Sequence, residues 1–126
     1  MFNPNLLQQR VTVLDNASGK GASKGVACNG HKKLVVQAVG NATATFDIEA
    51  TTQEVDANNI TIADNAATWA SLLLTNLASG ATAANISDQN IYSVDVGGLS
   101  RVCANVSSFT AGATDPKGLT VIFTLD

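Results

Sequence analysis

The residue types that most enzymes use for acid–base chemistry are scarce in this chain. It has one histidine, His31, which directly follows the dipeptide Asn29-Gly30 and precedes two lysines. A hydrolase triad needs a histidine base that an acid holds in place, and no acidic residue lies near His31 in the sequence. None of the short hydrolase or nucleotide-binding motifs occurs either. We therefore interpret His31 as a residue of a surface turn, and we expect a protein without catalytic residues that is not an enzyme.

Asp47 and Glu49 are the candidates for paired-carboxylate chemistry. They are two residues apart in an alternating segment, so their side chains lie on the same face of a strand, as a glycosidase-like pair would require. Such a pair also needs a cleft lined by aromatic side chains, and the chain has only one Trp, one Tyr and four Phe. Carboxylates that keep an exposed strand soluble are the more common arrangement, and we favour it here.

Metal sites require more ligands than the sequence provides. Cys28 and Cys103 are the only cysteines, and together with a single histidine they cannot complete a four-ligand zinc site. We expect two small buried thiols rather than a disulfide. The acidic loops at Asp56 and Asp64 lack the ligand spacing of a calcium loop and fit turn-forming roles. The sequence thus predicts neither a metal nor a cofactor.

Two single residues remain as candidates for binding. Trp69 is the only tryptophan and could stack on a sugar ring, but sugar-binding sandwiches usually present several aromatic residues, and Tyr92 is the only other one with a polar tip. Packing in the core or in an interface is the favoured role of Trp69. Arg101 follows a Gly-Gly turn, and it either binds a carboxylate of a neighbouring subunit or is a solvated charge at a strand end.

The composition argues against several classes of partner. Charged residues make up 13% of the chain, about half of the usual share, and the net charge is −3. Such a surface has no basic field for a phosphate backbone, so we expect no nucleic acid as a partner. No apolar run is long enough to span a membrane. The first ten residues lack the regions of a secretory signal, which fits a protein that stays in the cytoplasm or one whose signal has been removed.

Alternation of polar and apolar residues predicts strands through most of the chain. The clearest case is residues 41–53, NATATFDIEATTQ, in which Ala44, Phe46, Ile48 and Ala50 share one face. Further short alternating runs are separated by turns rich in Gly, Asn and Pro. The pattern is typical of an all-β fold, an antiparallel β-sandwich or jelly roll of seven to eight short strands, which forms a single domain over residues 10–126.

The sequence also predicts the turns between some strands and leaves one segment ambiguous. The tight-turn dipeptides Asn29-Gly30 and Gly40-Asn41 predict two adjacent hairpins, and hence an antiparallel meander. Residues 66–77 are ambiguous, because the spacing of Trp69, Leu72, Leu73 and Leu77 fits one short helix, whereas a short strand with a bulge is the alternative.

Four segments follow one another along the chain in a recognisable order. The segments are TATFDIEATTQ, TWASL, IYSVDVGGLSRVCANVSSFTAG and GLTVIFTL. With them the chain resembles the small decoration, or cement, proteins and head-fibre bases of tailed-bacteriophage capsids. The match covers residues 34–125, about three quarters of the chain. Residues 72–90 depart from the family pattern.

This resemblance implies a structural virion protein. It would be a β-sandwich, commonly a homotrimer, that sits on the capsid surface after assembly in the host cytoplasm, binds the major capsid protein and stabilises contacts between coat subunits. Residues 1–9 are then either an arm with apolar anchors or the lead-in to the first strand. The alternative function is a glycan-binding or adhesion module of a tail fibre or cell surface, in which Trp69 and Tyr92 contact sugar. The residues expected in the partner or subunit interface are Phe2, Leu6, Leu7, Trp69 and Arg101.

Overall fold

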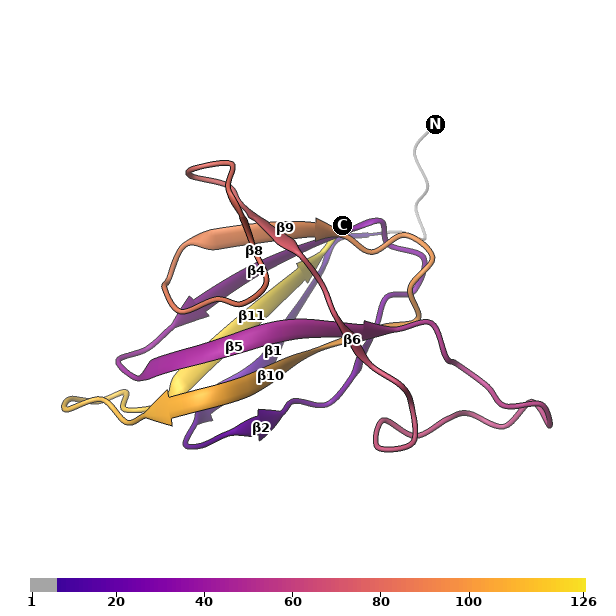
Figure 1. Ribbon diagram of the computed structural model, residues 1–126, viewed down its shortest axis with the longest axis horizontal. Helices are drawn as coiled ribbons and strands as arrows, with labels where there is room; N and C mark the ends of the chain where they lie inside the picture. Colours follow the sequence, from indigo (N-terminus) through magenta and orange to yellow (C-terminus); the bar gives the residue numbers. More distant parts are fainter. Residues whose placement is uncertain (1–6) are drawn as a thin grey trace.

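The computed structural model describes residues 7–126, which form a sandwich of two antiparallel sheets (Figure 1). None of these residues is helical, so the described part of the chain contains no helix that could cross a membrane. The all-β sandwich that the sequence predicts is confirmed. Its strands are β1 (Gln9–Ala17), β2 (Gly21–Ala22), β3 (Val26–Ala27), β4 (Lys33–Val39), β5 (Thr43–Thr51), β6 (Ala70–Ser71), β7 (Leu74–Asn76), β8 (Thr82–Ala83), β9 (Ile91–Asp95), β10 (Arg101–Thr110) and β11 (Leu119–Leu125).

From β4 onwards, the long strands β4, β5, β9, β10 and β11 alternate between the two sheets. The six-stranded sheet has the order β1-β11-β4-β9-β7-β8, and the five-stranded sheet has the order β2-β10-β5-β6, with β3 also paired to β10. Asn29 and Gly30 form the predicted tight turn with φ values of 52° and 79°, yet β3 and β4 on either side belong to different sheets. Gly40 and Asn41 likewise connect two strands of different sheets, β4 and β5. The expected meander is therefore wrong, because a turn reverses the chain but does not choose the strand that becomes the hydrogen-bonded partner.

The core lies between the two sheets and is built from the inward positions of the long strands. Phe46 and Ile48 of β5 are 1% and 0% exposed, whereas Asp47 between them is only partly buried. This period of two is what a half-buried strand requires, and it confirms the strand predicted within residues 41–53. Partners from the facing sheet include Val36 of β4 and Phe123 of β11, both fully buried.

Residues 66–77 do not form the helix that their spacing allowed. Part of the segment, β6, pairs with β5, and the amide of Leu72 then donates to the carbonyl of Ile48 at 2.8 Å. The chain next crosses to the other sheet, where β7 pairs with β9. A helix would satisfy its own backbone groups but would leave these strand edges open. Leu73 and Leu77, which suggested a helical face, are 61% and 52% exposed, so they form no buried stripe.

His31 is buried, and the prediction of a surface turn residue is wrong. The side chain is 5% exposed, and its Nδ1 has no hydrogen-bond partner among residues 7–126. The amides of the next residues, Lys32 and Lys33, both donate to the carbonyl of Asp126 at the end of the chain. This long-range pairing draws the turn against the sandwich, which buries the imidazole.

Gly118 permits the close approach of β1 and β11 and gives a test of this packing. Its amide donates to Oδ1 of Asn16 at 2.8 Å, and a Cβ at this position would lie 2.5 Å from the carbonyl carbon of Asn16. We expect Gly118→Ala to push the strands apart and to lower the free energy of unfolding by about 2 kcal/mol in chemical denaturation. Gly97→Ala is the matched control, since its added Cβ meets no atom within 4 Å. Equal losses in the two variants would contradict this explanation.

Candidate functional site

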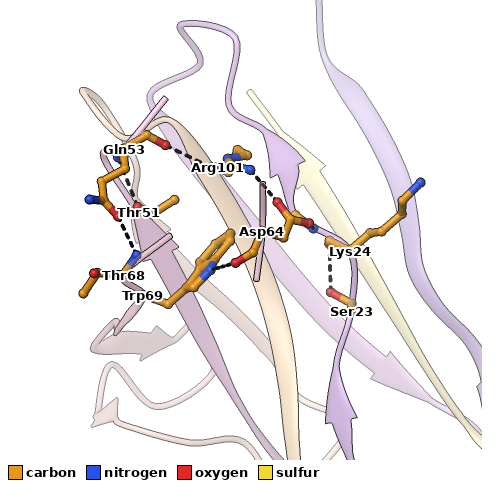
Figure 2. Close-up of polar contacts among 9 residues, drawn as sticks. Ser23, Lys24, Thr51, Gln53, Asp64, Thr68, Trp69 and Arg101 are labelled. Carbon is orange, nitrogen blue, oxygen red and sulfur yellow. Dashed lines mark hydrogen bonds and ion pairs between the residues drawn. The ribbon is translucent and has the colours of Figure 1, made fainter. Parts of the chain in front are cut away.

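A cluster of Trp69, Arg101 and Asp64 lies on the outer side of the five-stranded sheet (Figure 2). Arg101 begins β10, Trp69 directly precedes β6, and Asp64 comes from the loop of residues 52–69 between β5 and β6. The guanidinium carbon of Arg101 is 5.6 Å from the centroid of the Trp69 ring, and its Nη1 forms an ion pair with Oδ1 of Asp64 at 2.5 Å. Two of the residues expected in an interface thus contact each other within one chain.

Asp64 ties three separate segments together. Its Oδ2 accepts a hydrogen bond from the amide of Gly25 at 2.7 Å, and its backbone carbonyl accepts one from the indole Nε1 of Trp69 at 2.8 Å. A Cβ on Gly25 would lie 2.8 Å from Oδ1 of Asp64, so a larger residue here would have to displace the carboxylate that Gly25 and Arg101 bind. Sequence reasoning gave Asp64 a turn-forming role and missed this one, because its partners lie 37 and 39 residues away.

Beyond this anchor the loop of residues 52–69 extends away from the sandwich (Figure 1). Its tip is a short hairpin in which Asp56 Oδ1 accepts hydrogen bonds from the amides of Asn58 and Ile60. The turn-forming role predicted for Asp56 is therefore confirmed. Val55 and Ile60 are 45% and 61% exposed, so the tip presents apolar side chains to solvent.

A pocket of about 440 Å³ adjoins this cluster. Trp69 and Asn65 line it from the loop, and Glu49 and Cys103 line it from the sheet, where they are paired across β5 and β10. Glu49 and Asp47 share the outer face of β5, as predicted, but only Glu49 lines the pocket, whereas the carboxylate of Asp47 accepts a hydrogen bond from the hydroxyl of Ser71. The side chain of Lys24 points away from Trp69 in Figure 2.

Both cysteines are buried free thiols, as the sequence predicts. Burial raises the pKa of Cys28 to about 11. Burial also raises the pKa of Cys103, and the negative charges of Glu49, Asp64 and Asp47 raise it further, to about 12. Cys103 is 2% exposed although it lies on the outer side of its strand, since the segments around the pocket cover it.

The outer side of the six-stranded sheet has a different chemistry. Across its strands the register aligns Thr124, Val35, Ser93 and Thr75 in one row, and Thr12, Ile122, Gln37 and Ile91 in the next. Leu77 directly follows β7 and its amide donates to the carbonyl of Ile91, whereas Leu73 directly precedes β7, and both side chains are exposed. Arg10 stands at one end of the first row. We call these ten side chains the uncharged face: Thr12, Val35, Gln37, Leu73, Thr75, Leu77, Ile91, Ser93, Ile122 and Thr124.

The uncharged face exposes several large apolar groups. Leu73, Leu77 and Ile91 are 61%, 52% and 41% exposed, and the amide of Leu77 donates to the carbonyl of Ile91, which keeps these two residues adjacent. A shallow depression of about 250 Å³ on this side of the sheet is lined by five residues of the uncharged face and by Arg10: Val35, Gln37, Ile91, Ile122, Thr124 and Arg10. Sequence analysis did not single out this surface, because it is assembled from strands that are distant in the chain.

The remaining residues predicted for an interface or for sugar binding are Leu7, Phe2, Leu6 and Tyr92. Leu7 precedes β1 and is 65% exposed. Phe2 and Leu6 lie outside the described residues. Tyr92 faces the core of the six-stranded sheet at 4% exposure, and its hydroxyl donates to the carboxylate of Asp88, so that burial and this hydrogen bond raise its pKa. Tyr92 and Trp69 therefore do not form a common sugar-binding surface, and that part of the alternative prediction is wrong.

Removal of the Arg101 side chain tests the anchoring of the loop. In Arg101→Ala the ion pair with Asp64 and the contact with Trp69 are lost, and we expect the Gly25 and Ile62 amides to exchange with solvent at least about tenfold faster. These amides donate to Asp64 and to the carbonyl of Glu54. Arg10→Ala, on the opposite sheet, is the control and should leave both rates unchanged. Equal rates in the two variants would disprove the anchoring role.

The thiols give a second test at this site. Because both are buried and protonated at pH 8, iodoacetamide should alkylate them more than about a hundredfold more slowly in the folded protein than in the denatured chain. Mass spectrometry after timed quenching measures each site. Rapid alkylation of Cys103 in the native protein would contradict its burial, because it would mean that the segments covering this thiol open to solvent.

Comparison with known proteins extends these observations. No protein-family model matches the chain, and no curated protein matches it significantly. Among solved structures, the SPBc2 prophage-derived protein YomS is similar with a TM-score of 0.71 at 20% identity, over 94% of this chain and 91% of YomS. The PBSX exported protein XepA is similar with a TM-score of 0.74 at 14% identity, over 94% of this chain and 37% of XepA. The chain thus shares its fold with phage-derived proteins.

Proposed function

We propose that this protein is a structural component of a phage particle, and specifically a decoration, or cement, protein that binds the outer surface of the capsid. It acts without catalysis, by burying surface against the major capsid protein and bracing neighbouring coat subunits. The observation that carries the proposal is the uncharged face. The similarity in fold to phage-derived proteins supports it.

The uncharged face has the properties of a docking surface. Contiguous exposed apolar groups on a soluble domain commonly mark an interaction site, and the buried centre of an interface is poor in charged residues. Leu77 and Ile91 meet both conditions, since they are adjacent and exposed, and the strand residue paired with Ile91 is the uncharged Gln37. Because the face is built on hydrogen-bonded strands, little conformational entropy is lost when a partner covers it.

The proposed homotrimer uses other surfaces. A closed ring of subunits needs two different patches that meet at each contact, and the uncharged face is reserved for the coat protein in this arrangement. Leu7, which leads into β1 and is 65% exposed, is an apolar group for one such patch.

Charged substitutions on the uncharged face test the capsid contact. Leu77→Glu and Ile91→Glu place a carboxylate where an apolar contact is proposed, and we expect each to weaken binding to capsids at least about tenfold. Binding is measured by co-sedimentation with heads assembled from the major capsid protein of the same phage genome. Ile60→Glu, at an equally exposed position on the loop tip, is the control and should bind normally.

Two results would overturn the proposal. One is the absence of the protein from purified particles on a density gradient. The other is an equal effect of Glu at positions 60, 77 and 91 on binding, because that would place the contact elsewhere.

The oligomeric state is a separate measurement. Sedimentation equilibrium should give three times the subunit mass of 12.9 kDa. A monomer at micromolar concentration would remove the trimer from the proposal while leaving the test of the capsid contact intact.

A further inference from the structure

The geometry of the pocket beside Trp69 points to a second binding activity, and we propose that this pocket binds an uncharged saccharide unit of an oligosaccharide. The pocket lies on the outer side of the five-stranded sheet, away from the uncharged face. This activity is therefore additional to the proposed capsid contact and does not depend on it.

The aromatic wall of the pocket is held in a fixed position. The indole Nε1 of Trp69 donates to the carbonyl of Asp64, and the guanidinium of Arg101 covers the ring from 5.6 Å. At its far end the ring lies against Gly25, where an added Cβ would be 3.1 Å from Cη2. Trp69 is also one of the residues that line the pocket. A rigid indole surface with its negative π cloud suits the weakly positive C–H groups on one side of a pyranose ring.

Polar groups with spare hydrogen-bonding capacity stand next to this ring. The side chain of Glu49 is partly buried, and within residues 7–126 its carboxylate forms no ion pair. The one hydrogen bond that this carboxylate accepts there comes from the Cys103 thiol, with 4.0 Å between Sγ and Oε1. It can accept hydrogen bonds from two adjacent sugar hydroxyls. The Asn65 amide, which is both donor and acceptor, lines the same pocket and is exposed. One aromatic wall with a few converging polar groups is the usual composition of a small-molecule site.

The size and charge of the pocket narrow the class of ligand. Its volume of about 440 Å³ lies within the range of small-molecule sites. Glu49 and Asp64 line it, and Asp47 is close enough to contribute to the raised pKa of Cys103. Lys24 also lines the pocket, but its side chain points away from Trp69 (Figure 2), and Arg101 beside Trp69 is ion-paired with Asp64. Acidic sugars are therefore disfavoured, and uncharged ones fit.

Tryptophan fluorescence gives a direct assay, because Trp69 is the only tryptophan and reports on the pocket alone. We would titrate the full chain with soluble oligosaccharides of glucose, galactose, mannose and N-acetylglucosamine, and with oligogalacturonate as the acidic probe. The expected result is a saturable change with at least one neutral probe, with a dissociation constant on the order of 1 mM, and no change with oligogalacturonate.

Two pocket variants and one control locate the site. Glu49→Gln keeps the shape of the side chain but loses the charged acceptor, and Asn65→Ala removes the amide, so each should weaken binding at least about fivefold. Glu54→Gln, on the exposed part of the same loop, should bind as the unmodified protein does. Circular dichroism and the emission spectrum without sugar verify that each variant is folded.

Three outcomes would overturn the assignment. They are a flat response to every neutral probe, a preference for oligogalacturonate, and a response that neither Glu49→Gln nor Asn65→Ala weakens. None of them bears on capsid binding, so failure here is distinguishable from failure of the proposed function.

Discussion

The antiparallel pairing of β5 and β10 is the interaction on which the rest of the structure depends. It extends from Thr51 opposite Arg101 to Thr43 opposite Thr110, which makes these strands the centre of the five-stranded sheet. On the inner side the pairing supplies core residues of both strands. On the outer side it places Glu49 next to Cys103, and at its end it places Arg101 where the loop of residues 52–69 leaves β5. The ion pair with Asp64, and with it the position of Trp69, follow from this register.

The two outer sides of the sandwich differ because the few charges are unevenly placed. Only 13% of the residues are charged, so a row of strand residues with few charges is easily formed, and Arg10 is the one charged member of the two rows described on the six-stranded sheet. A surface of Thr, Val and Ile carries no charge, so covering it with a protein avoids the large desolvation cost of an unpaired ion. The opposite side concentrates the carboxylates of Glu49 and Asp64 beside the indole ring of Trp69. Such a site recognises polar groups one by one, whereas the uncharged face is suited to burial over a large area.

The sequence predicts those parts of the molecule that depend on local patterns. Burial with a period of two marks β5, and turn chemistry marks Asn29-Gly30, since both are properties of neighbouring residues. Other features of the fold depend on pairing between segments that are distant in the sequence. His31 is buried because residues 32 and 33 bind the end of the chain, and the Leu-rich segment after Trp69 is extended because two sheet edges needed a partner. The pocket and the uncharged face could not be predicted for the same reason, as each is assembled across strands of distant sequence position.

The positions of the two surfaces also relate the two proposals to each other. The uncharged face and the Trp69 pocket lie on opposite sides of a sandwich that is only two sheets thick, so a large partner can cover one without touching the other. In the proposed arrangement a subunit that docks on the capsid through Leu77 and Ile91 presents Glu49 and Trp69 to the surrounding medium. Strong binding by a single copy is then unnecessary, because many subunits on one particle can engage a polysaccharide at once, and their individually weak contacts add up through high effective concentration.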